Sequence, residues 1–331
     1  MVESSTQCVV CGKLLLGPRI TAREMMFGVG EEFVYLECES CGSLQIQVAP
    51  ASFSKYYPSC YYSFAPVDSL ASMLGSVSYF IGELNQRMRL DSTFIGGVMS
   101  LPKAFLSRFA DPLVHEHVRI LGMTPSSRIL DVGCANGMYL ISLRLLGFRN
   151  LVGIDPYIAK PIEMPGLRLL KKELYELEDN FDFIVFNHSF EHIPSPERVL
   201  RQVHRILEND GKCMIRTPIV PSFAWNNYRA EWIQLDPPRH SFIVSRKGAL
   251  ELAKRCGFRV SCIRDDSNEM QFWGSEQYRR GIPFMSPQSH YVNPRKSIFN
   301  ANQIHSFKER ASELNARHLG DQAEIVMEKV L

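Results

Sequence analysis

The sequence predicts an α/β protein with a mainly parallel, doubly wound sheet, preceded by a small cysteine-rich module. From about residue 112 onward, strand-like and helix-like segments alternate, as they do in parallel sheets with helices on both faces. A glycine-containing loop, Asp131–Gly137, joins one of these strands to the following helix. Near the N-terminus, four cysteines form two C-x-x-C pairs.

Length and composition set the broad class of the protein. The 331 residues are enough for about two domains, and 45% hydrophobic with 22% charged residues excludes wholesale disorder and fibrous repeats. No apolar run approaches the roughly 18 residues of a membrane span. The polar start, Met1–Gln7, has neither the basic nor the apolar part of a secretory signal, which predicts a cytoplasmic location.

The charge of the chain is nearly balanced, with 37 Lys and Arg residues against 35 Asp and Glu residues and a formal net charge of +2. Such a chain has no general basic field for phosphate backbones. Nucleic acid is therefore disfavoured as a partner, although the overall charge does not exclude a local basic patch. The sequence makes no prediction about oligomeric state.

Caps, breakers and apolar runs place the elements of the predicted sheet. Gly122 ends the first helix, and Ser195 and Ser245 are N-cap residues of two later helices. Pro161 and Pro165 interrupt the chain where a full crossover helix would be expected. The predicted strands are 128–132, 151–155, 167–170, 181–186, 211–216 and 258–263, and the predicted helices are 113–121, 138–146, 196–207 and 246–255.

Both ends of the chain depart from this alternation. We expect residues 1–50 to form the cysteine module, residues 51–111 to form a helical connector with an amphipathic run at 77–90, and residues 112–331 to form the sheet domain. Within that domain, residues 266–300 show no regular pattern. The tail then predicts a helix with the apolar positions Ile304, Phe307, Ala311 and Leu314 on one face, followed by a last strand, 324–330.

The glycine loop and the acidic residue that follows it predict a nucleoside-cofactor site. Gly133 and Gly137 let a ligand approach the backbone, and the next helix points its first amides into the same space. Asp155 ends the following strand, where a carboxylate can accept hydrogen bonds from ribose hydroxyls. A dinucleotide such as NAD prefers G-x-G-x-x-G, whereas this loop is G-x-x-x-G. Asp131 would also repel a pyrophosphate and attract a sulfonium, so a cationic nucleoside cofactor is favoured over NAD.

The chain resembles the class I S-adenosylmethionine-dependent methyltransferases over residues 112–265. The matching segments are Ile129–Gly137, Gly153–Pro156, Phe181–Ile193 and Arg205–Ile215, which occur in the order and spacing of that family. The resemblance implies a Rossmann-like core of seven strands. Its last strand, 324–330, would be antiparallel and inserted between the fifth and sixth, which makes residues 266–320 an insertion. The alternative is a protein with a similar nucleotide-binding-like fold whose site is inactive or has another function.

The resemblance also implies which residues bind S-adenosylmethionine. The methionine part would lie against the glycine loop, the ribose against Asp155, the adenine near residues 172–174, and the reacting methyl group above residues 187–188. Lys172 and Glu173 depart from the acidic-plus-small pattern common at the adenine site. The implied cofactor-binding residues are Asp131, Gly133, Cys134, Ala135, Asn136, Gly137, Asp155, Pro156, Lys172, Glu173, Leu174, Asn187 and His188.

Three histidines are candidates for a general base. Methyl transfer from a sulfonium needs mainly alignment of donor and acceptor, but a hydroxyl acceptor also gains from proton removal. His188 and His192 follow a strand at the carboxyl edge of the sheet, and His240 lies in a segment that could cover the pocket. Each could equally be a hydrogen-bonded structural residue.

Two further segments bear on the acceptor. Asp236-Pro-Pro-Arg239 resembles the motif of enzymes that methylate amines on bases, but it follows the wrong strand, and the proper position reads Asn187-His-Ser-Phe190. Base N-methylation is therefore disfavoured. Trp273–Tyr278 mixes aromatic, amide and acidic side chains, which suits either a sugar-like ligand or a packed connector.

The paired cysteines predict a structural zinc site. Cys8-Val-Val-Cys11-Gly and Cys38-Glu-Ser-Cys41-Gly have the C-x-x-C-G form of zinc knuckles, and four thiolates close a tetrahedral site with no open position for catalysis. A redox pair would need one C-x-x-C beside a βαβ unit rather than two. A zinc-ribbon-like module of this kind stabilises a segment too small to bury its own core.

The fuller resemblance is to bacterial methyltransferases of polysaccharide and secondary-metabolite biosynthesis. These relatives begin with such knuckles, continue with a Tyr-rich segment like Lys55–Phe64, and have tails like Ser275–Tyr278. Their acceptors are sugars, nucleotide sugars or related small molecules, and the C-methylating members carry a further C-terminal domain that this chain lacks. We therefore expect O-methylation of a saccharide or small-molecule acceptor. An RNA methyltransferase whose zinc module grips RNA, and a non-catalytic protein of this fold, are the alternatives.

Overall fold

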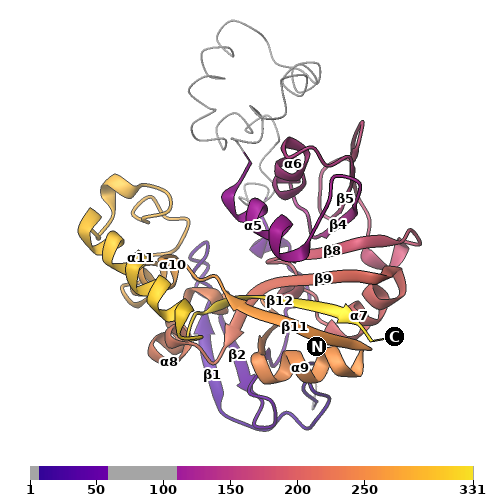
Figure 1. The fold of residues 1–331 in the computed structure, drawn as a ribbon. Coiled ribbons are helices and arrows are strands. Elements are labelled where there is room, and N and C mark those ends of the chain that lie inside the picture. The colour runs from indigo at the N-terminus through magenta and orange to yellow at the C-terminus, as the bar shows by residue number, and fades with distance from the viewer. Residues whose placement is uncertain (1–6, 59–109, 331) are drawn as a thin grey trace, which may run out of the picture. The chain divides into compact units, whose positions relative to one another are not determined.

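The computed structural model describes residues 7–58 and 110–330, which form two compact units. The first, here called the cysteine unit, contains residues 7–57, 186–205 and 213–330. The second, here called the loop unit, contains Pro58 and residues 110–185 and 206–212. Most of the predicted connector, including the run 77–90, lies outside the described residues (Figure 1).

The loop unit contains a sheet with the strand order β8-β4-β5-β7-β6. Strands β8, β4, β5 and β7 are parallel, and β6 forms an antiparallel hairpin with β7 in the stretch where Pro161 and Pro165 exclude a crossover helix. Gly122, at φ 74°, ends the first helix as predicted. The elements are α5 Pro112–Leu121, β4 Arg128–Val132, α6 Met138–Leu145, β5 Asn150–Ile154, β6 Ile162–Met164, β7 Leu167–Leu170, η5 Leu174–Glu176 and β8 Phe181–Asn187.

The cysteine unit begins with three antiparallel strands, β1 Arg19–Arg23, β2 Glu32–Glu37 and β3 Leu44–Ile46. Strand β3 pairs antiparallel with β10, and β10 pairs parallel with β9. Further along, β11 and β12 lie side by side with α9 along them (Figure 1). The remaining elements are η1 Ser54–Tyr56, η6 Phe190–His192, α7 Pro196–Ile206, β9 Leu207–Val220, α8 Phe223–Tyr228, η7 Arg229–Glu231, η8 Ile233–Leu235, β10 Phe242–Ser245, α9 Arg246–Arg255, β11 Phe258–Asp265, α10 Met270–Arg279, η9 Pro294–Lys296, α11 Ala301–Ala316 and β12 Gln322–Lys329.

The predicted last strand is confirmed. Strand β12 is antiparallel to β11 and also pairs with β9, so it is inserted between the strands predicted as fifth and sixth. The mixed α/β fold with a largely parallel sheet is therefore the one that the sequence predicts. None of the helices in the two described stretches combines the length and apolarity needed to cross a membrane.

Two parts of the cysteine unit differ from the prediction. Residues 266–300 were expected to be irregular, but 270–279 form α10. This helix buries polar Gln271, Ser275 and Gln277 together with its aromatic residues, so no apolar stripe of helical period marks it in the sequence. Strand β10 has only four residues, all buried, and it was missed because so short an apolar run carries no periodicity.

The N-terminal strands share one hydrophobic core with the later part of the cysteine unit. Tyr35 and Leu44, from β2 and β3, are completely buried, and they belong to the same cluster as Trp232 and Phe272. A segment of about 50 residues cannot bury much core by itself. Here it buries its apolar side chains against residues more than 150 positions later in the chain.

Candidate functional site

The glycine loop of the loop unit folds back over the end of β5. The amides of Gly133 and Cys134 both donate to the carbonyl of Ile154, at 2.8 and 3.1 Å. Gly137 has φ 79°, and a Cβ there would lie 2.5 Å from Cδ1 of Leu169. Because a side chain at position 137 would be both strained and blocked, the tight turn before α6 requires glycine.

Asp155 connects this loop to the end of β5. Its Oδ2 accepts a hydrogen bond from the amide of Ala135 at 3.1 Å, and its Oδ1 accepts one from the amide of Tyr157 at 2.8 Å. Ala135 has φ 46°, a left-handed conformation that an alanine adopts only when its surroundings hold it. Each carboxylate oxygen can accept more than one hydrogen bond, so the residue can hold the loop and still bind a hydroxyl.

Asp131 lies beside this turn, and one of its two carboxylate oxygens has no hydrogen-bond partner among the described residues. Its side chain is 2% exposed, and its Oδ1 accepts no hydrogen bond from the described residues. Burial, and then the charge of Asp155, raises the pKa of Asp131 to about 7. A buried carboxylate without a donor is costly, so this atom indicates a cationic or hydrogen-bond-donating ligand.

The charge on Asp131 should also oppose folding, and Asp131→Asn should therefore stabilise the ligand-free protein above neutral pH. The pKa rises from 3.8 to about 7 on folding, so stability is lost as pH rises from about 4 to 7 and stays lower above that range. Thermal unfolding should show a higher melting temperature for the variant at pH 8 and little change at pH 4. An equal shift at both pH values, or the same shift in the exposed control Asp179→Asn, would contradict this assignment.

The residues predicted to flank the adenine form a short, well-defined turn after β7. The amide of Lys172 donates to the carbonyl of Leu170 at 3.0 Å. Glu173 caps η5 in a reciprocal capping box with Glu176, and Leu174 is 5% exposed. The turn is ordered by its own hydrogen bonds, and its contact with a cofactor stays a prediction.

In the cysteine unit, the three candidate histidines surround one buried carboxylate. Glu191 is completely buried, and its Oε2 accepts a hydrogen bond from the hydroxyl of Thr217 at 3.0 Å. Its Oε1 lies 3.4 Å from Nδ1 of His188 and 3.8 Å from Nε2 of His240. Burial alone would raise the pKa of Glu191, but the interaction with His188 and the charges of the neighbouring histidines hold it at about 2. Glu191 is therefore an anion at neutral pH.

The hydrogen bonds of His192 and His240 assign their tautomers. Nδ1 of His240 is 2.7 Å from the carbonyl of Gln234, and Nδ1 of His192 is 2.9 Å from the carbonyl of Arg239. A carbonyl only accepts, so both Nδ1 atoms carry the proton and both Nε2 atoms keep a lone pair when the rings are neutral. His240 is 5% exposed, and burial, followed by its neighbour His192, lowers its pKa to about 4.

His192 is oriented by contacts at its Nδ1 and at one edge of its ring. It is only partly buried, its ring packs edge-on against His240 at 4.8 Å between centroids, and its Nδ1 also lies 3.1 Å from the hydroxyl of Tyr57. A catalytic imidazole needs one nitrogen held by an orienting acceptor and the other free for substrate. Glu191, His192 and His240 also offer atoms within 4.8 Å of one another, a set that could hold a cation, but the two donating Nδ1 atoms favour a proton-transfer network.

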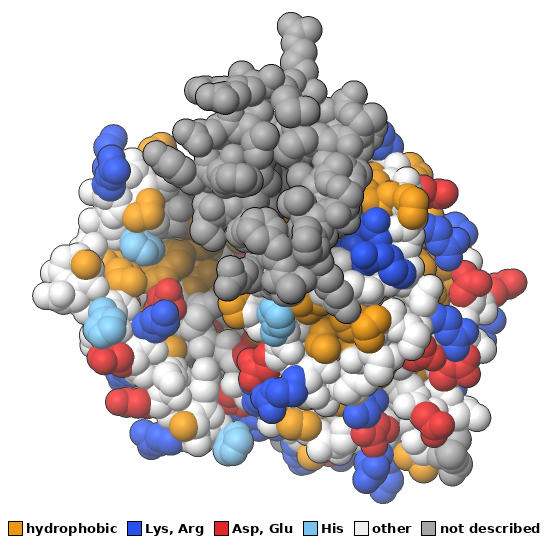
Figure 2. Space-filling view, turned by 45° about the horizontal axis from the view of Figure 1, so that its top comes forward, with side chains coloured by type: hydrophobic (Ala, Val, Ile, Leu, Met, Phe, Trp, Pro, Cys, Tyr) orange, Lys and Arg blue, Asp and Glu red, His pale blue; other side chains and the backbone are white. Residues whose placement is uncertain are grey.

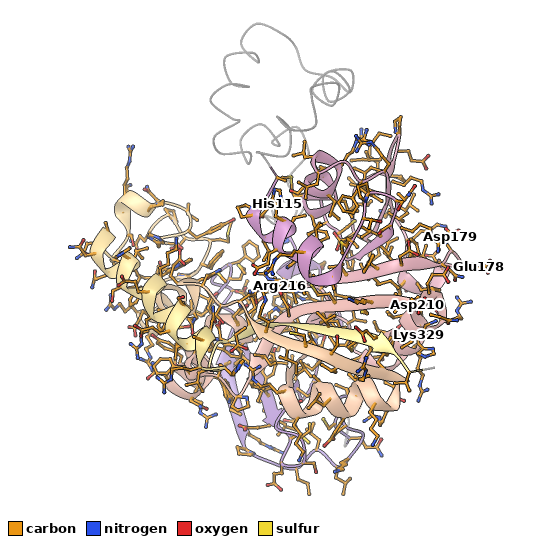
Figure 3. All side chains as sticks on the ribbon, in the orientation of Figure 1. His115, Glu178, Asp179, Asp210, Arg216 and Lys329 are labelled. Carbon is orange, nitrogen blue, oxygen red and sulfur yellow. The ribbon has the colours of Figure 1, made fainter. Side chains whose placement is uncertain are left out.

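Asn187 and His188 lie where β8 ends. Both side-chain polar atoms of Asn187 are buried and have no hydrogen-bond partner in the described chain, which indicates a ligand there. The amide of His188 donates to the carbonyl of Arg216 at 2.9 Å, and His188 has φ 50°. The Arg216 guanidinium, labelled in Figure 3, is paired with Asp266, which anchors this part of β9.

The four N-terminal cysteines converge. Sγ of Cys8 lies 3.7 Å from that of Cys41, and Sγ of Cys11 lies 3.7 Å from that of Cys38. All four are buried, and none is in a disulfide. The two knuckles have the same backbone pattern: Gly12 donates to the carbonyl of Cys8 at 2.8 Å, and Gly42 donates to that of Cys38 at 2.6 Å. The four side chains could hold one metal ion.

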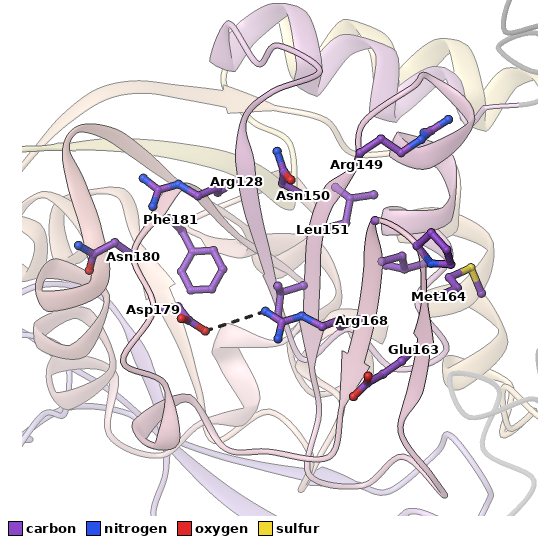
Figure 4. A pocket seen from close by; sticks show the side chains of 14 residues that line it. Arg128, Arg149, Asn150, Leu151, Glu163, Met164, Arg168, Asp179, Asn180 and Phe181 are labelled. Atoms are coloured by element: carbon purple, nitrogen blue, oxygen red, sulfur yellow. Dashed lines mark ion pairs between the residues drawn. The ribbon is translucent and has the colours of Figure 1, made fainter.

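A large hollow of about 670 Å³ lies elsewhere in the loop unit (Figure 4). It is bordered by Arg128, Asn150, Leu167 and Phe181, which are the first residues of β4, β5, β7 and β8. The glycine loop follows the carboxyl end of β4, at the opposite edge of this parallel sheet. Ligands of such sheets bind at the carboxyl edge, so we do not assign this hollow to the cofactor.

Two segments noted in the sequence are packed within the cysteine unit. Trp273–Tyr278 lies in α10, where Trp273 stacks on Phe284 at 5.9 Å and Ser275 is completely buried. The packed-connector interpretation is therefore the one that the structure supports. In Asp236-Pro-Pro-Arg239, both charged side chains are buried in an ion pair at 2.5 Å. That pair accounts for the motif without a base substrate.

Comparison with known proteins agrees with this geometry. Residues 103–263 match a family model described as "Methyltransferase domain". A ubiquinone biosynthesis O-methyltransferase of Xanthomonas oryzae is 28% identical over 128 residues, which are 34% of this chain and 53% of that protein. A tRNA U34 carboxymethyltransferase of Aeromonas salmonicida is 26% identical over 179 residues, 50% of this chain and 54% of that protein. The chain thus spans about half the length of these curated relatives.

One solved structure that the chain matches is that of the mycolic acid cyclopropane synthase CmaA1, with a TM-score of 0.42 and 16% identity. The match covers 65% of this chain and 82% of that one. Another is the Haloferax volcanii complex of the Trm112 methyltransferase activator with a methyltransferase, with a TM-score of 0.45, 14% identity, and coverage of 68% and 94%. The matching family model, the order of the motifs and the glycine loop lead to one assignment. The part of this chain that matches the model, residues 103–263, belongs to the class I S-adenosylmethionine-dependent methyltransferases.

Proposed function

We propose that this protein transfers the methyl group of S-adenosylmethionine to a hydroxyl of a sugar, a nucleotide sugar or a related small molecule. The observation that carries the cofactor assignment is the buried Oδ1 of Asp131, which has no hydrogen-bond partner among the described residues. It lies beside a glycine loop whose turn before α6 is so close that position 137 admits no Cβ. An ammonium and a sulfonium on one ligand would neutralise this carboxylate.

The residues of the glycine loop and β5 would divide the cofactor between them. Asp131 would bind the amino group, and Asp155 would accept hydrogen bonds from the ribose in addition to those it accepts from Ala135 and Tyr157. When bound, S-adenosylmethionine supplies an activated methyl group. The unpartnered amide of Asn187 and the nearby His188 are the further candidate contacts.

On the acceptor side, we assign His192 as the general base. Its Nδ1 proton is held by the carbonyl of Arg239, so its Nε2 can accept the proton of an acceptor hydroxyl as the oxygen attacks the methyl carbon. The anionic Glu191 nearby stabilises the resulting imidazolium. His240 is too buried to receive substrate, and it packs against His192 to fix the ring.

We further propose that Cys8, Cys11, Cys38 and Cys41 bind one structural zinc ion. Zinc–sulfur bonds of about 2.3 Å place the sulfur atoms of a regular tetrahedron about 3.8 Å apart. The two measured Sγ separations are both 3.7 Å. Four protein ligands leave no open position, so the ion would stabilise the fold rather than activate a substrate.

A small acceptor agrees better with the surface than RNA does. The formal net charge is +2, and Figure 2 shows acidic and basic side chains interspersed over the described part of one face. The ubiquinone relative is named as an O-methyltransferase, which supports a hydroxyl acceptor. The tRNA relatives support RNA as the second candidate, and RNA predicts affinity that falls steeply with salt.

The cofactor assignment is tested by Asp155→Ala in a calorimetric titration with S-adenosylmethionine. Loss of charge-assisted hydrogen bonds to ribose should weaken binding by about 10- to 100-fold, because each is worth about 1.5–3 kcal/mol. Asp179→Ala, an exposed acid elsewhere in the loop unit, is the matched control and should bind normally. Unchanged affinity in Asp155→Ala would overturn the assignment.

The acceptor is best found by transfer of a labelled methyl group into fractionated cell extract. We expect label in a saccharide or small-molecule fraction that is insensitive to ribonuclease. Label in RNA would favour the second candidate. Cofactor binding without label in any fraction would show a non-catalytic protein of this fold.

A further inference from the structure

We propose that Arg239 is a positioning residue through which the N-terminal cysteine module sets the orientation of His192. This inference deepens the proposed function, because it takes His192 as the base. It starts from one juxtaposition: the backbone carbonyl that accepts the Nδ1 proton of His192 belongs to Arg239, and the guanidinium of the same residue is held by the N-terminal segment.

Arg239 is held by four hydrogen bonds in a completely buried position. Its guanidinium donates to both carboxylate oxygens of Asp236, at 2.9 and 2.5 Å, to Oε1 of Glu24 at 2.9 Å, and to the carbonyl of Tyr56 at 3.2 Å. The side chains of Arg239 and Glu24 are both 0% exposed. A guanidinium held by hydrogen bonds on several sides restricts the movement of its residue, including the backbone carbonyl that faces His192.

Glu24 is itself a fixed point of the turn between β1 and β2. Its Oε1 accepts a hydrogen bond from the amide of Phe27 at 3.0 Å, and its Oε2 accepts one from the amide of Val29 at 2.9 Å. Its own amide donates to the carbonyl of Glu31 at 2.8 Å. The carboxylate is therefore held on one side by the N-terminal module and on the other by Arg239.

The cysteine knuckle holds the other end of the same segment. The hydroxyl of Ser245 donates to the carbonyl of Cys41, and the amide of Ser245 donates to the hydroxyl of Ser43 at 3.0 Å. Between these ends, the phenol of Tyr35 donates to the carbonyl of His240 at 2.7 Å. Residues 236–245 are thus held along their length by the module that begins with the cysteines.

This arrangement determines which ring nitrogen of His192 carries the proton. A free histidine prefers to carry its proton on Nε2, and in that form it could not take a proton there. The Arg239 carbonyl, 2.9 Å from Nδ1, reverses this preference only while the 236–240 peptide keeps its direction. The module would then act on the acceptor chemistry and not on the two carboxylates proposed to bind the cofactor, Asp131 and Asp155, which lie in the other unit.

The test is nitrogen NMR of ¹⁵N-histidine-labelled full-length protein, with His192 assigned from the spectrum of His192→Asn. We expect the wild-type His192 to be in the Nδ1–H tautomer. In Glu24→Gln, and in the milder Tyr35→Phe, we expect its signals to shift toward the Nε2–H form. In the transfer assay, the rate should fall by as much as about a hundredfold, as is typical when a catalytic group is misplaced by about 1 Å. Affinity for S-adenosylmethionine should stay within about twofold of wild type, as expected when no cofactor contact is lost.

Glu32→Gln is the matched control, since it removes one carboxylate from the same hairpin at an exposed ion pair with Arg23. It should change neither the tautomer nor the rate. The proposal is overturned if wild-type His192 is in the Nε2–H form, or if both test variants keep the wild-type tautomer while only their melting temperature falls. Failure of the proposed function would give a different result. The two test variants would still shift the His192 tautomer, but even the wild-type protein would show no methyl transfer.

Discussion

Replacement of Cys38 by serine is expected to reduce the zinc content of the purified protein from one equivalent per chain to almost none and to lower its melting temperature sharply. Structural zinc contributes on the order of 10 kcal/mol of apparent binding free energy in small zinc modules. The loss should spread beyond the knuckles, because the N-terminal strands share their core with the rest of the cysteine unit. Elemental analysis and calorimetric unfolding give the two measurements.

Cys262→Ser is the control for this result. Cys262 is the exposed cysteine on β11, outside the cluster of four, and its replacement should leave one equivalent of zinc and the wild-type melting temperature. The zinc assignment is wrong if wild-type protein prepared with zinc in the growth medium contains no metal. It is also wrong if Cys38→Ser retains a full equivalent.

Replacement of His192 by asparagine is expected to reduce methyl transfer by about 10²- to 10⁴-fold, the usual contribution of a positioned general base. Cofactor affinity should be unchanged, because the variant removes a proton acceptor and no predicted cofactor contact. The measurement is the rate of label transfer into the acceptor fraction, with S-adenosylmethionine binding followed by calorimetry.

His115→Asn is the matched control, since His115 is an exposed histidine on α5 in the loop unit (Figure 3). It should transfer label at the wild-type rate. If His192→Asn keeps most of its activity and His188→Asn loses it, the base is His188, whose Nδ1 lies 3.4 Å from the Glu191 carboxylate.

Much of the candidate cofactor site could be predicted as a cluster because its residues are local in the chain. Asp131, Gly133 and Gly137 lie on one strand–loop–helix turn, and Asp155 ends the next strand, so the order of parallel strands is enough to bring them together. The cysteine quartet was predictable for a similar reason, since each pair lies within a single knuckle. The raised pKa of Asp131 was not, because it depends on complete burial and on the nearby charge of Asp155.

The acceptor side was predictable only as a set of candidate histidines. Glu191 stands next to His192 in the sequence, but its complete burial among three imidazoles depends on the packing of β9 and of residues 236–242 around it. Tyr57 was part of a noted Tyr-rich segment, and nothing in its spacing indicates a contact with His192. The order of preference among His188, His192 and His240 comes from hydrogen-bond partners and exposure.

By itself, then, the sequence determined the α/β fold, the antiparallel last strand, the glycine loop proposed to bind the cofactor and the convergence of the four cysteines, because each follows from a short-range pattern of strands, glycines or knuckles. The tertiary structure decided which backbone carbonyl accepts the Nδ1 proton of His192 and what holds that carbonyl in place. The physical reason is distance along the chain: the Glu24 carboxylate that fixes Arg239 lies 215 residues before it, and no local pattern encodes a buried ion pair over that separation.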